Sequence, residues 1–255
     1  MNEIPQFAPV SLEEMDSVKL MNRVDSKYLT DEATLDGILA DALASGYRAL
    51  VADGLMVSPY DTVYYDTPDH RMFLDHRNGR LTRQKVRTRE YLASGRAFLE
   101  VKRKNNHGRT KKKRTEIPSD AFRDFGACPE ACSYLAERSD FPAEQLSPSL
   151  ETRFRRITLV NPAMTERLTI DRSVAFTNLR NGREASLADG VVIELKQDGR
   201  AESRMKQILL DRRVKPVRVS KYCIGLALTD PEIRAGRFKE RIRIIEKQIH
   251  TTISI

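Results

Sequence analysis

The stretch FLEVKRKNNHGRTKKKR, residues 98–114, decides how the middle of the chain must fold. Its first half alternates, because Leu99 is apolar whereas Glu100, Lys102 and Lys104 are charged. Successive side chains of a β-strand point to opposite faces, so this pattern predicts a strand with one apolar and one charged face. NNHGR contains turn residues, and TKKKRTEI then predicts a return strand. The stretch therefore predicts a hairpin whose charged face is strongly basic.

The same separation of charged and apolar side chains recurs on several other segments. The groups that share one face of a predicted strand are Arg83, Lys85, Arg87 and Arg89; Glu100, Lys102 and Lys104; Lys112 and Arg114; Arg167 and Asp171; Glu194 and Lys196. Like charges directly opposite each other destabilise a sheet. For any single strand, a solvated basic face is the simpler interpretation. For five strands together, we favour a sheet closed around a polar interior, where a polyanion neutralises the cations.

The order of the predicted elements favours an α+β fold in a single domain over residues 1–255. Ser11 and Glu14 form a capping-box pattern, and Thr30 is the expected cap of the next helix. Helices are predicted over 11–24, 30–45, 119–138, 202–211, 220–228 and 231–250. Most of the strands fall between the second helix and residue 198, without regular βαβ alternation. We therefore expect a mostly antiparallel sheet or barrel with flanking helices. P-loop and Rossmann motifs do not occur.

Composition narrows the class of partner. The formal net charge is +8, which favours anionic partners. Aromatic residues make up 7% and Trp is missing, so the stacking side chains typical of nucleic-acid binding are scarce, and we do not expect nucleic acid as a partner. No apolar run reaches the about 20 residues of a membrane span, and the first residues do not resemble an export signal. With three cysteines suggesting a reducing compartment, we expect a cytoplasmic protein.

An ordered set of motifs resembles a known family. The motifs are NRVDSKY, YYDTPDHRMF, KVRTREY, FLEVKRK, KKKR, LTID, VVIELK and VSKYCIG. In this order they resemble the VTC domain, the polyphosphate polymerase module, in its stand-alone bacterial form. That module belongs to the triphosphate tunnel metalloenzymes, also called CYTH-like proteins. The resemblance covers a core of about 22–228. It implies an eight-stranded antiparallel β-barrel with flanking and capping helices, whose lumen is lined by Lys and Arg.

The resemblance also implies roles for individual residues. Arg87, Arg89, Lys102 and Lys221 are the expected catalytic cations, and Glu194 is the expected metal ligand. Substrate-binding roles are implied for Arg23, Lys27, Lys85, Lys104, Lys112, Arg156, Arg167 and Lys196. Arg155 remains an alternative to Arg156, because the family has Tyr-x-Arg where this chain has Phe-Arg-Arg. Glu100 is a candidate second metal ligand, or else a counter-charge to the lysines. Arg23 is expected about one helical turn before Lys27.

The implied activity is metal-dependent phosphoryl transfer, with Mn²⁺ or Mg²⁺ as cofactor. Polyphosphate synthesis from ATP, with release of ADP, is the first expectation. Hydrolysis of tripolyphosphate or a nucleoside triphosphate is the alternative, and a non-catalytic polyphosphate sensor is the second alternative. The regulatory SPX domain and the membrane segments of the eukaryotic proteins are not seen in this sequence, so any link to a membrane would need a membrane protein partner. Without ligand, Arg87, Arg89 and Lys102 are expected to repel each other.

Overall fold

The structure is a computed structural model that describes residues 4–16, 23–107, 109–199, 202–233 and 236–249. Its strands are β1 (Ala8–Val10), β2 (Arg23–Asp31), β3 (Arg48–Leu50), β4 (Ser58–Asp66), β5 (Arg83–Tyr91), β6 (Arg96–Lys104), β7 (Thr110–Ile117), β8 (Ser147–Val160), β9 (Glu166–Asn178), β10 (Glu184–Ser186) and β11 (Gly190–Asp198). Its α-helices are α1 (Leu12–Asp16), α2 (Glu32–Ala44), α3 (Arg71–Arg77), α4 (Pro129–Ala136), α5 (Arg204–Asp211), α6 (Lys221–Thr229) and α7 (Gly236–Ile249), and 3-10 turns cover Ser119–Phe122, Phe125–Ala127 and Ala143–Gln145.

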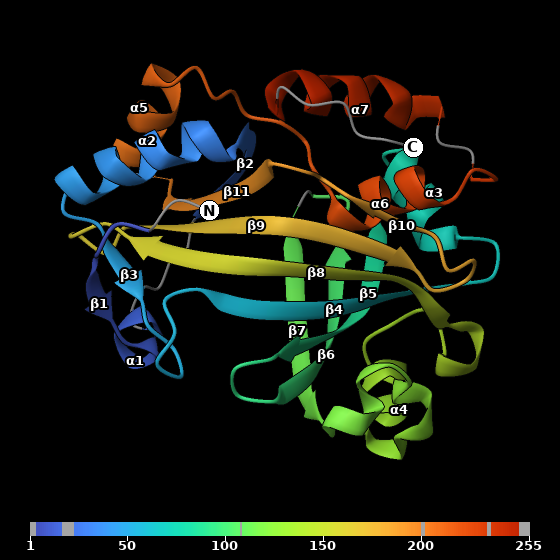
Figure 1. The fold of residues 1–255 in the computed structure, drawn as a ribbon. Helices are drawn as coiled ribbons and strands as arrows, with labels where there is room; N and C mark the ends of the chain where they lie inside the picture. The colour runs from blue at the N-terminus through green and yellow to red at the C-terminus, as the bar shows by residue number, and fades with distance from the viewer. Residues whose placement is uncertain (1–3, 17–22, 108, 200–201, 234–235, 250–255) are drawn as a thin grey trace.

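Eight strands form one continuous antiparallel ladder in the order β2-β11-β9-β8-β4-β5-β6-β7. In Figure 1, β8 and β9 run across the view, whereas β6 and β7 run nearly at right angles to them behind. The sheet is therefore strongly curled, with a concave and a convex face. Within the described residues, the two end strands β2 and β7 do not pair with each other, so the curl stays open between them. The expected antiparallel α+β fold is confirmed, and the eight strands of the expected barrel form an open, curled sheet.

Two apolar clusters cover the convex face. Under α2 and α5, alternate residues of β11 such as Ile193 and Leu195 are fully buried with Leu35 and Ile208. Under the segment that carries α4, alternate residues of β5 and β6, such as Leu99, are buried with the aromatic rings of this insert. Burial of one face fixes the register, because a slip by one residue would turn every apolar side chain to the opposite face. The charged residues between them must therefore face the concave side.

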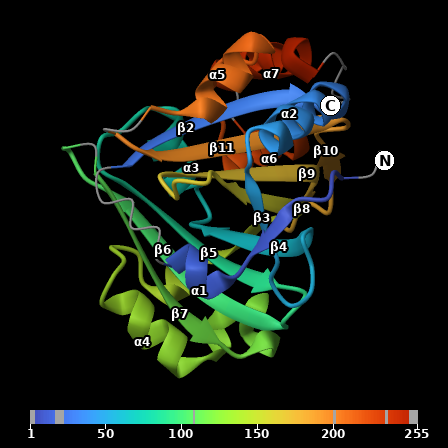
Figure 2. The same ribbon diagram turned by 90° about the vertical axis from the view of Figure 1, so that its left-hand side faces the viewer.

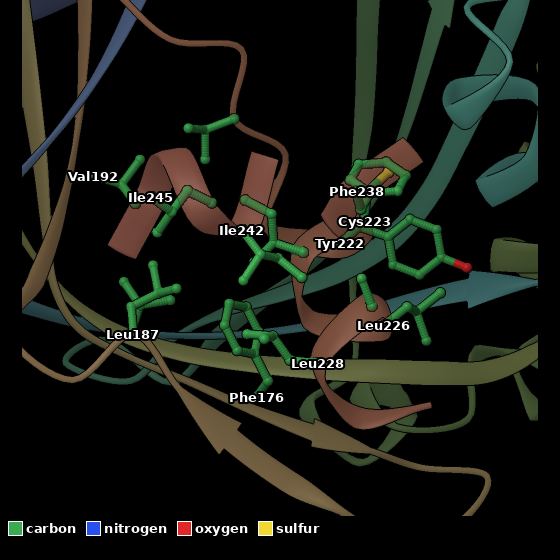
Figure 3. Close-up of a cluster of buried hydrophobic side chains, with 14 of the residues drawn as sticks. Phe176, Leu187, Val192, Tyr222, Cys223, Leu226, Leu228, Phe238, Ile242 and Ile245 are labelled. Carbon is green, nitrogen blue, oxygen red and sulfur yellow. The ribbon is translucent and has the colours of Figure 1, made fainter. Parts of the chain in front are cut away.

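The concave face has a charged half and an apolar half. Along β11, Val192 shares the face of Glu194, and along β2, Leu29 shares the face of Lys27. The apolar half is covered by α6 and α7, whose side chains Leu226, Phe238 and others pack on it (Figure 3). Helix α6 begins at the boundary between the two halves, so its first turn lies beside the charges.

The predicted helices are mostly confirmed, with two corrections near the N-terminus. The capping box is present, because the Ser11 amide donates to Glu14 and the Glu14 amide donates to the Ser11 hydroxyl. Helix α1 is described over Leu12–Asp16, and residues 17–22 of the predicted helix lie outside the described residues. Arg23 belongs to β2, which pairs with β11, so its expected position one helical turn before Lys27 is wrong. The cap of α2 is Asp31, whose carboxylate accepts a 2.7 Å hydrogen bond from the Thr34 amide, in place of Thr30. Strand pairing of β2 with β11 overrides the helical pattern predicted for residues 23 and 24.

Candidate functional site on the concave face

Strands β5, β6 and β7 contribute one continuous set of charges to the concave face. The register of β5 and β6 places Arg87 opposite Glu100 and Lys85 opposite Lys102. The register of β6 and β7 places Lys112 opposite Lys102. The Arg87 Nε donates a 2.8 Å hydrogen bond to Glu100, and Lys112 donates one of 2.9 Å to its second oxygen. Glu100 is only 1% exposed. Burial would raise its pKa, but Arg87, Arg89 and Lys112 outweigh burial and hold the pKa far below its usual range.

Glu100 therefore acts as an internal counter-ion. Both of its carboxylate oxygens are engaged by cations, which makes Glu100 less suited to a metal ion. Of the two roles that the sequence left open for Glu100, this geometry supports the counter-charge.

Asp171 on β9 is a second counter-ion on the same face. The Arg156 guanidinium binds it bidentately, with Nε–Oδ1 and Nη2–Oδ2 distances of 2.5 and 2.8 Å, and the Lys221 ammonium group also donates to it. Burial opposes ionisation of Asp171, but Arg156 and Lys221 outweigh it and keep the pKa well below its usual range. Sequence reasoning noted Asp171 only as a neighbour of Arg167. Its position in LTID, opposite an arginine, was the signal for this role.

Register distinguishes Arg156 from Arg155. Arg156 lies opposite Asp171 and shares the face of Phe154, whereas Arg155 points to the other face and is exposed. The Arg156 guanidinium carbon lies 5.0 Å from the ring centroid of Tyr60 and 5.2 Å from that of Phe154. The rings and Asp171 together fix this guanidinium, so Arg156 is the arginine on the concave face.

Four further cations lack a carboxylate partner. Lys27 donates to the Val219 carbonyl oxygen at 3.2 Å, and Lys85 donates to the Ser220 hydroxyl at 2.8 Å. Arg89 donates to the Thr62 hydroxyl at 3.2 Å and is 7% exposed. In the described part of the chain, no carboxylate lies within ion-pairing distance of Lys27, Lys85, Arg89 or Lys102. Buried or crowded cations without counter-ions are costly unless an external anion pairs with them.

The crowding of these cations changes their acid–base properties. The Lys102 side chain reaches solvent, but burial by surrounding groups and repulsion from Lys27 lower its pKa to about 8, although Glu194 opposes the shift. Lys27 on β2 and Lys85 on β5 bind the consecutive residues Val219 and Ser220, so strands that are far apart in the ladder face each other across the concave side. Tyr64 responds in the opposite sense: burial opposes its ionisation, but Arg87 and Lys85 prevail and lower its pKa to about 8.

Glu194 is the carboxylate best suited to hold a metal ion. Burial opposes its ionisation, but Lys27 and Lys196 outweigh burial and keep its pKa well below the usual range. Its ion pair with Lys196 is long, at 3.5 Å, and its side chain is 24% exposed. Among the described residues, no three His, Cys, Asp or Glu side chains are grouped so that they could hold a metal. Mg²⁺ commonly binds one or two carboxylates and completes its shell with substrate phosphates and water, and Glu194 fits this mode.

The remaining predicted site residues lie around this centre. Lys104 lies opposite Arg83 at the end of the β5–β6 pair. Arg167 and Lys196 lie opposite each other on β9 and β11, and repulsion between them contributes to a lowered pKa of Lys196 after burial. The side chain of Arg23 lies outside the described residues. We call the set Lys27, Lys85, Arg87, Arg89, Lys102, Lys104, Lys112, Arg156, Arg167, Lys196 and Lys221 the cationic face.

Lys221 was expected at the site, whereas Val219 and Ser220, which precede α6, and the tyrosines of β4 were not. Val219 and Ser220 bind Lys27 and Lys85, and Lys221 binds Asp171, so three consecutive residues contact three strands. The Tyr64 hydroxyl accepts a 3.2 Å hydrogen bond from Arg87. The motifs YYDT and VSKY contain these residues, but their contacts depend on long-range packing.

Comparison with known proteins identifies the family. The family model described as VTC domain matches residues 22–229, and the chain belongs to this family. A search of curated proteins found no match. Among solved structures, HpAC1 from Hippeastrum, described as having a dominant triphosphatase activity, is similar with 15% identity and a TM-score of 0.49, covering 80% of this chain and 94% of that one. A conserved hypothetical protein from Pyrococcus furiosus has 13% identity and a TM-score of 0.46, covering 79% and 99%.

Structural similarities at this low sequence identity support no conclusion about the activity of this protein.

None of the helices in the described residues has both the length and the apolar character needed to cross a bilayer.

Proposed function

We propose that this protein transfers phosphoryl groups along polyphosphate chains bound to the cationic face, and that the reaction is polyphosphate synthesis from ATP with release of ADP. Two findings support phosphoryl chemistry on polyphosphate or triphosphate: membership of the VTC domain family, and the cluster of Lys27, Lys85, Arg89 and Lys102 without carboxylate partners. The cluster of cations carries the proposal, because a chain of phosphates has the repeated negative charge that these side chains do not receive from the protein.

In the proposed reaction, the terminal phosphate oxygen of a growing chain attacks the γ-phosphorus of ATP. A new P–O bond forms there, and the bond between the γ-phosphorus and the bridging oxygen breaks. ADP leaves with the electron pair. The attacking oxygen is already ionised, so no side chain has to remove a proton. Catalysis then depends on in-line positioning and on neutralising charge in the transition state.

The residues of the cationic face have complementary tasks in this proposal. Arg89 and Arg156 present planar guanidinium groups, which bind phosphate oxygens bidentately, and the aromatic rings beside them fix their orientation. Lys85, Lys102 and Lys27 act as point charges along the chain. When bound to Glu194 and the substrate phosphates, Mn²⁺ or Mg²⁺ would neutralise charge on the reacting phosphates.

The test is to incubate the purified protein with ATP and Mn²⁺, and to follow both polyphosphate on a gel and free orthophosphate. Synthesis predicts long chains together with ADP. Orthophosphate without chains would identify a triphosphate hydrolase on the same site, and binding without turnover would identify a sensor. In either case the synthetic proposal fails.

Matched variants show whether the cationic face is responsible. Lys102→Gln is expected to reduce turnover by about 10- to 100-fold, because one phosphate contact in the transition state is lost. Lys206→Gln removes the same charge from an exposed position on α5 and is expected to leave turnover unchanged. Equal activity of both variants would contradict the assignment of the site.

A further inference from the structure

The second hairpin strand carries cations on both of its faces. Lys112 and Arg114 face the concave side and have partners there: Lys112 binds Glu100, and the Arg114 guanidinium carbon lies 4.7 Å from the ring centroid of Phe98. Lys111 and Lys113 alternate with them, point to the convex side and are exposed. In the described part of the chain, no carboxylate lies within ion-pairing distance of Lys111 or Lys113. These two lysines have no function in the site described above.

Other charges near these lysines are already neutralised. Arg103 lies opposite Lys111 on β6, but its guanidinium binds the Asp140 carboxylate at 2.8 and 3.0 Å. Lys113 lies opposite the buried Val101. Lys111 and Lys113, in contrast to Arg103, have no carboxylate within ion-pairing distance among the described residues, and we call them the outer pair. Their side chains emerge from alternate positions, about 7 Å apart along the strand.

The outer pair lies beside a route to the cationic face. β7 is at one end of the ladder and pairs only with β6 within the described residues (Figure 2). A strand is narrow, with about 4.8 Å between neighbouring strands. A flexible anionic polymer that contacts Lys112 on the concave side can therefore pass around this edge and meet the outer pair without leaving the protein surface.

We propose that the outer pair binds the part of a long polyphosphate chain that extends beyond the cationic face, around the β7 edge. This inference rests on the proposed function, and it specifies a long polymer, in contrast to a triphosphate, as the ligand of the whole surface. Tripolyphosphate is too short to occupy the centre and the outer pair together. Long chains gain two extra charge contacts, which slows their release between successive additions.

The composition of the surface favours polyphosphate over other polyanions. Nucleic acid without sequence preference is usually bound by cations together with aromatic rings that stack on bases. The aromatic residue of β6, Phe98, faces the concave side and is 7% exposed. A lipid surface would require exposed apolar side chains beside the lysines, and the large exposed apolar residues of the described chain lie outside β6 and β7. The outer pair therefore provides positive charge without stacking or apolar contacts, which suits polyphosphate, a ligand with a negative charge on every unit.

A structural explanation also exists for lysines on an edge strand, because they prevent pairing with the edge of another molecule. The two explanations differ in their consequences. Edge protection predicts that loss of the outer pair promotes self-association and leaves ligand affinity unchanged. Polymer binding predicts a loss of affinity that depends on the length of the ligand.

The experiment measures dissociation constants of tripolyphosphate and of a long-chain polyphosphate for the wild type and for Lys111→Gln with Lys113→Gln, at several salt concentrations. The expected result is about a three- to tenfold weaker affinity for the long chain, with tripolyphosphate affinity unchanged. The slope of log Kd against log salt for the long chain should also fall by about 1 to 2. Lys206→Gln with Lys215→Gln removes the same charge from exposed positions in and after α5 and should change neither affinity. Helix α5 lies far from β7 in Figures 1 and 2.

Each other outcome overturns the inference in a recognisable way. Unchanged affinity for both ligands, with or without dimerisation, means that the outer pair only protects the edge. An equal loss for both ligands means that these lysines belong to the central site. An equal effect of the control pair means that net charge alone matters. If the wild type binds neither ligand, the proposed function itself fails, which is distinct from all of these results.

Discussion

Arg87 and Glu100 face each other across the β5–β6 pair, with a 2.8 Å hydrogen bond from the arginine to a carboxylate that is almost completely buried. A carboxylate in this position is charged because of its neighbours, and its neighbours are tolerated because of its charge. The cationic face thus contains an internal anion that stabilises the fold, and a second anion, Glu194, whose surroundings leave it accessible. The two glutamates should respond differently to neutralisation.

Glu100→Gln is expected to lower the free energy of unfolding by about 2–4 kcal/mol, because Arg87 and Lys112 lose their shared counter-charge. Glu194→Gln is expected to lower it by less than Glu100→Gln does, because Glu194 is partly exposed and its ion pair is long. Urea denaturation without ligand measures both values. Equal destabilisation by the two variants would contradict the division of roles.

Glu194→Gln should abolish most metal-dependent turnover while retaining much of the affinity for polyphosphate. The amide keeps the size of the side chain but is a poor ligand for a divalent cation, whereas the phosphate-binding cations remain. Turnover across a Mn²⁺ titration and polyphosphate binding without metal give the two readouts. Normal turnover of this variant would remove Glu194 from the metal role.

Tyr64 should report occupation of the cationic face. Without ligand, its hydroxyl is expected to ionise near pH 8, because Arg87 and Lys85 favour the phenolate despite burial. A bound polyanion offsets these cations, so tripolyphosphate should move the transition to higher pH. Tyrosinate absorbance measures the titration, and Tyr64→Phe should remove it, whereas Tyr134→Phe should not. A transition that tripolyphosphate does not move would mean that the anion binds elsewhere.

Tripolyphosphate at a hundredfold excess over its dissociation constant should raise the melting temperature by about 5–10 °C, corresponding to about 2.7 kcal/mol. Arg89→Gln with Lys102→Gln should lose most of this rise and melt no lower than wild type without ligand, because both cations lack a carboxylate partner. The sequence suggested that Arg87 would behave in the same way. Its ion pair with Glu100 shows otherwise, and Arg87→Ala is expected to lower the ligand-free melting temperature. A full ligand-induced shift in the double variant would disprove the site.

The convex face contains a pH-sensitive pair of acids. Burial and the neighbouring Glu151 carboxylate raise the pKa of Asp61 to about 7, while Arg123 binds Glu151. The folded state then retains a proton that the unfolded chain loses near pH 4. Stability from this group is therefore lost as pH rises toward 7. Between pH 5 and 8 we expect a loss of about 2–3 kcal/mol, which Asp61→Asn should largely abolish and the exposed Asp120→Asn should not. Chemical denaturation at both pH values checks this, and an unchanged loss in Asp61→Asn would refute it.

Alternation alone predicted which side of each strand carries charge, because period two is local information. It placed Lys85, Arg87 and Lys102 correctly relative to their apolar neighbours. It could not predict that β4 lies between β8 and β5, since this order follows from packing between distant segments. For the same reason it missed which cations have counter-ions. Arg23 shows a second reason why local patterns fail: the sequence around it has a helical pattern, but pairing of β2 with β11 makes it part of a strand.

The contacts of residues 219–221 set the order in which the site can be assembled. Lys27, Lys85 and Asp171 all receive partners from this short segment, which lies late in the sequence. Tyr222, the next residue, donates to Asp66, the carboxylate that also accepts from the first amides of α3. Chains are synthesised from the N-terminus at about 5–20 residues per second. The nascent protein thus displays Lys27, Lys85 and Asp171 on the ribosome before the segment that organises them has emerged, and the site can be assembled only after residues 219–221 have been made.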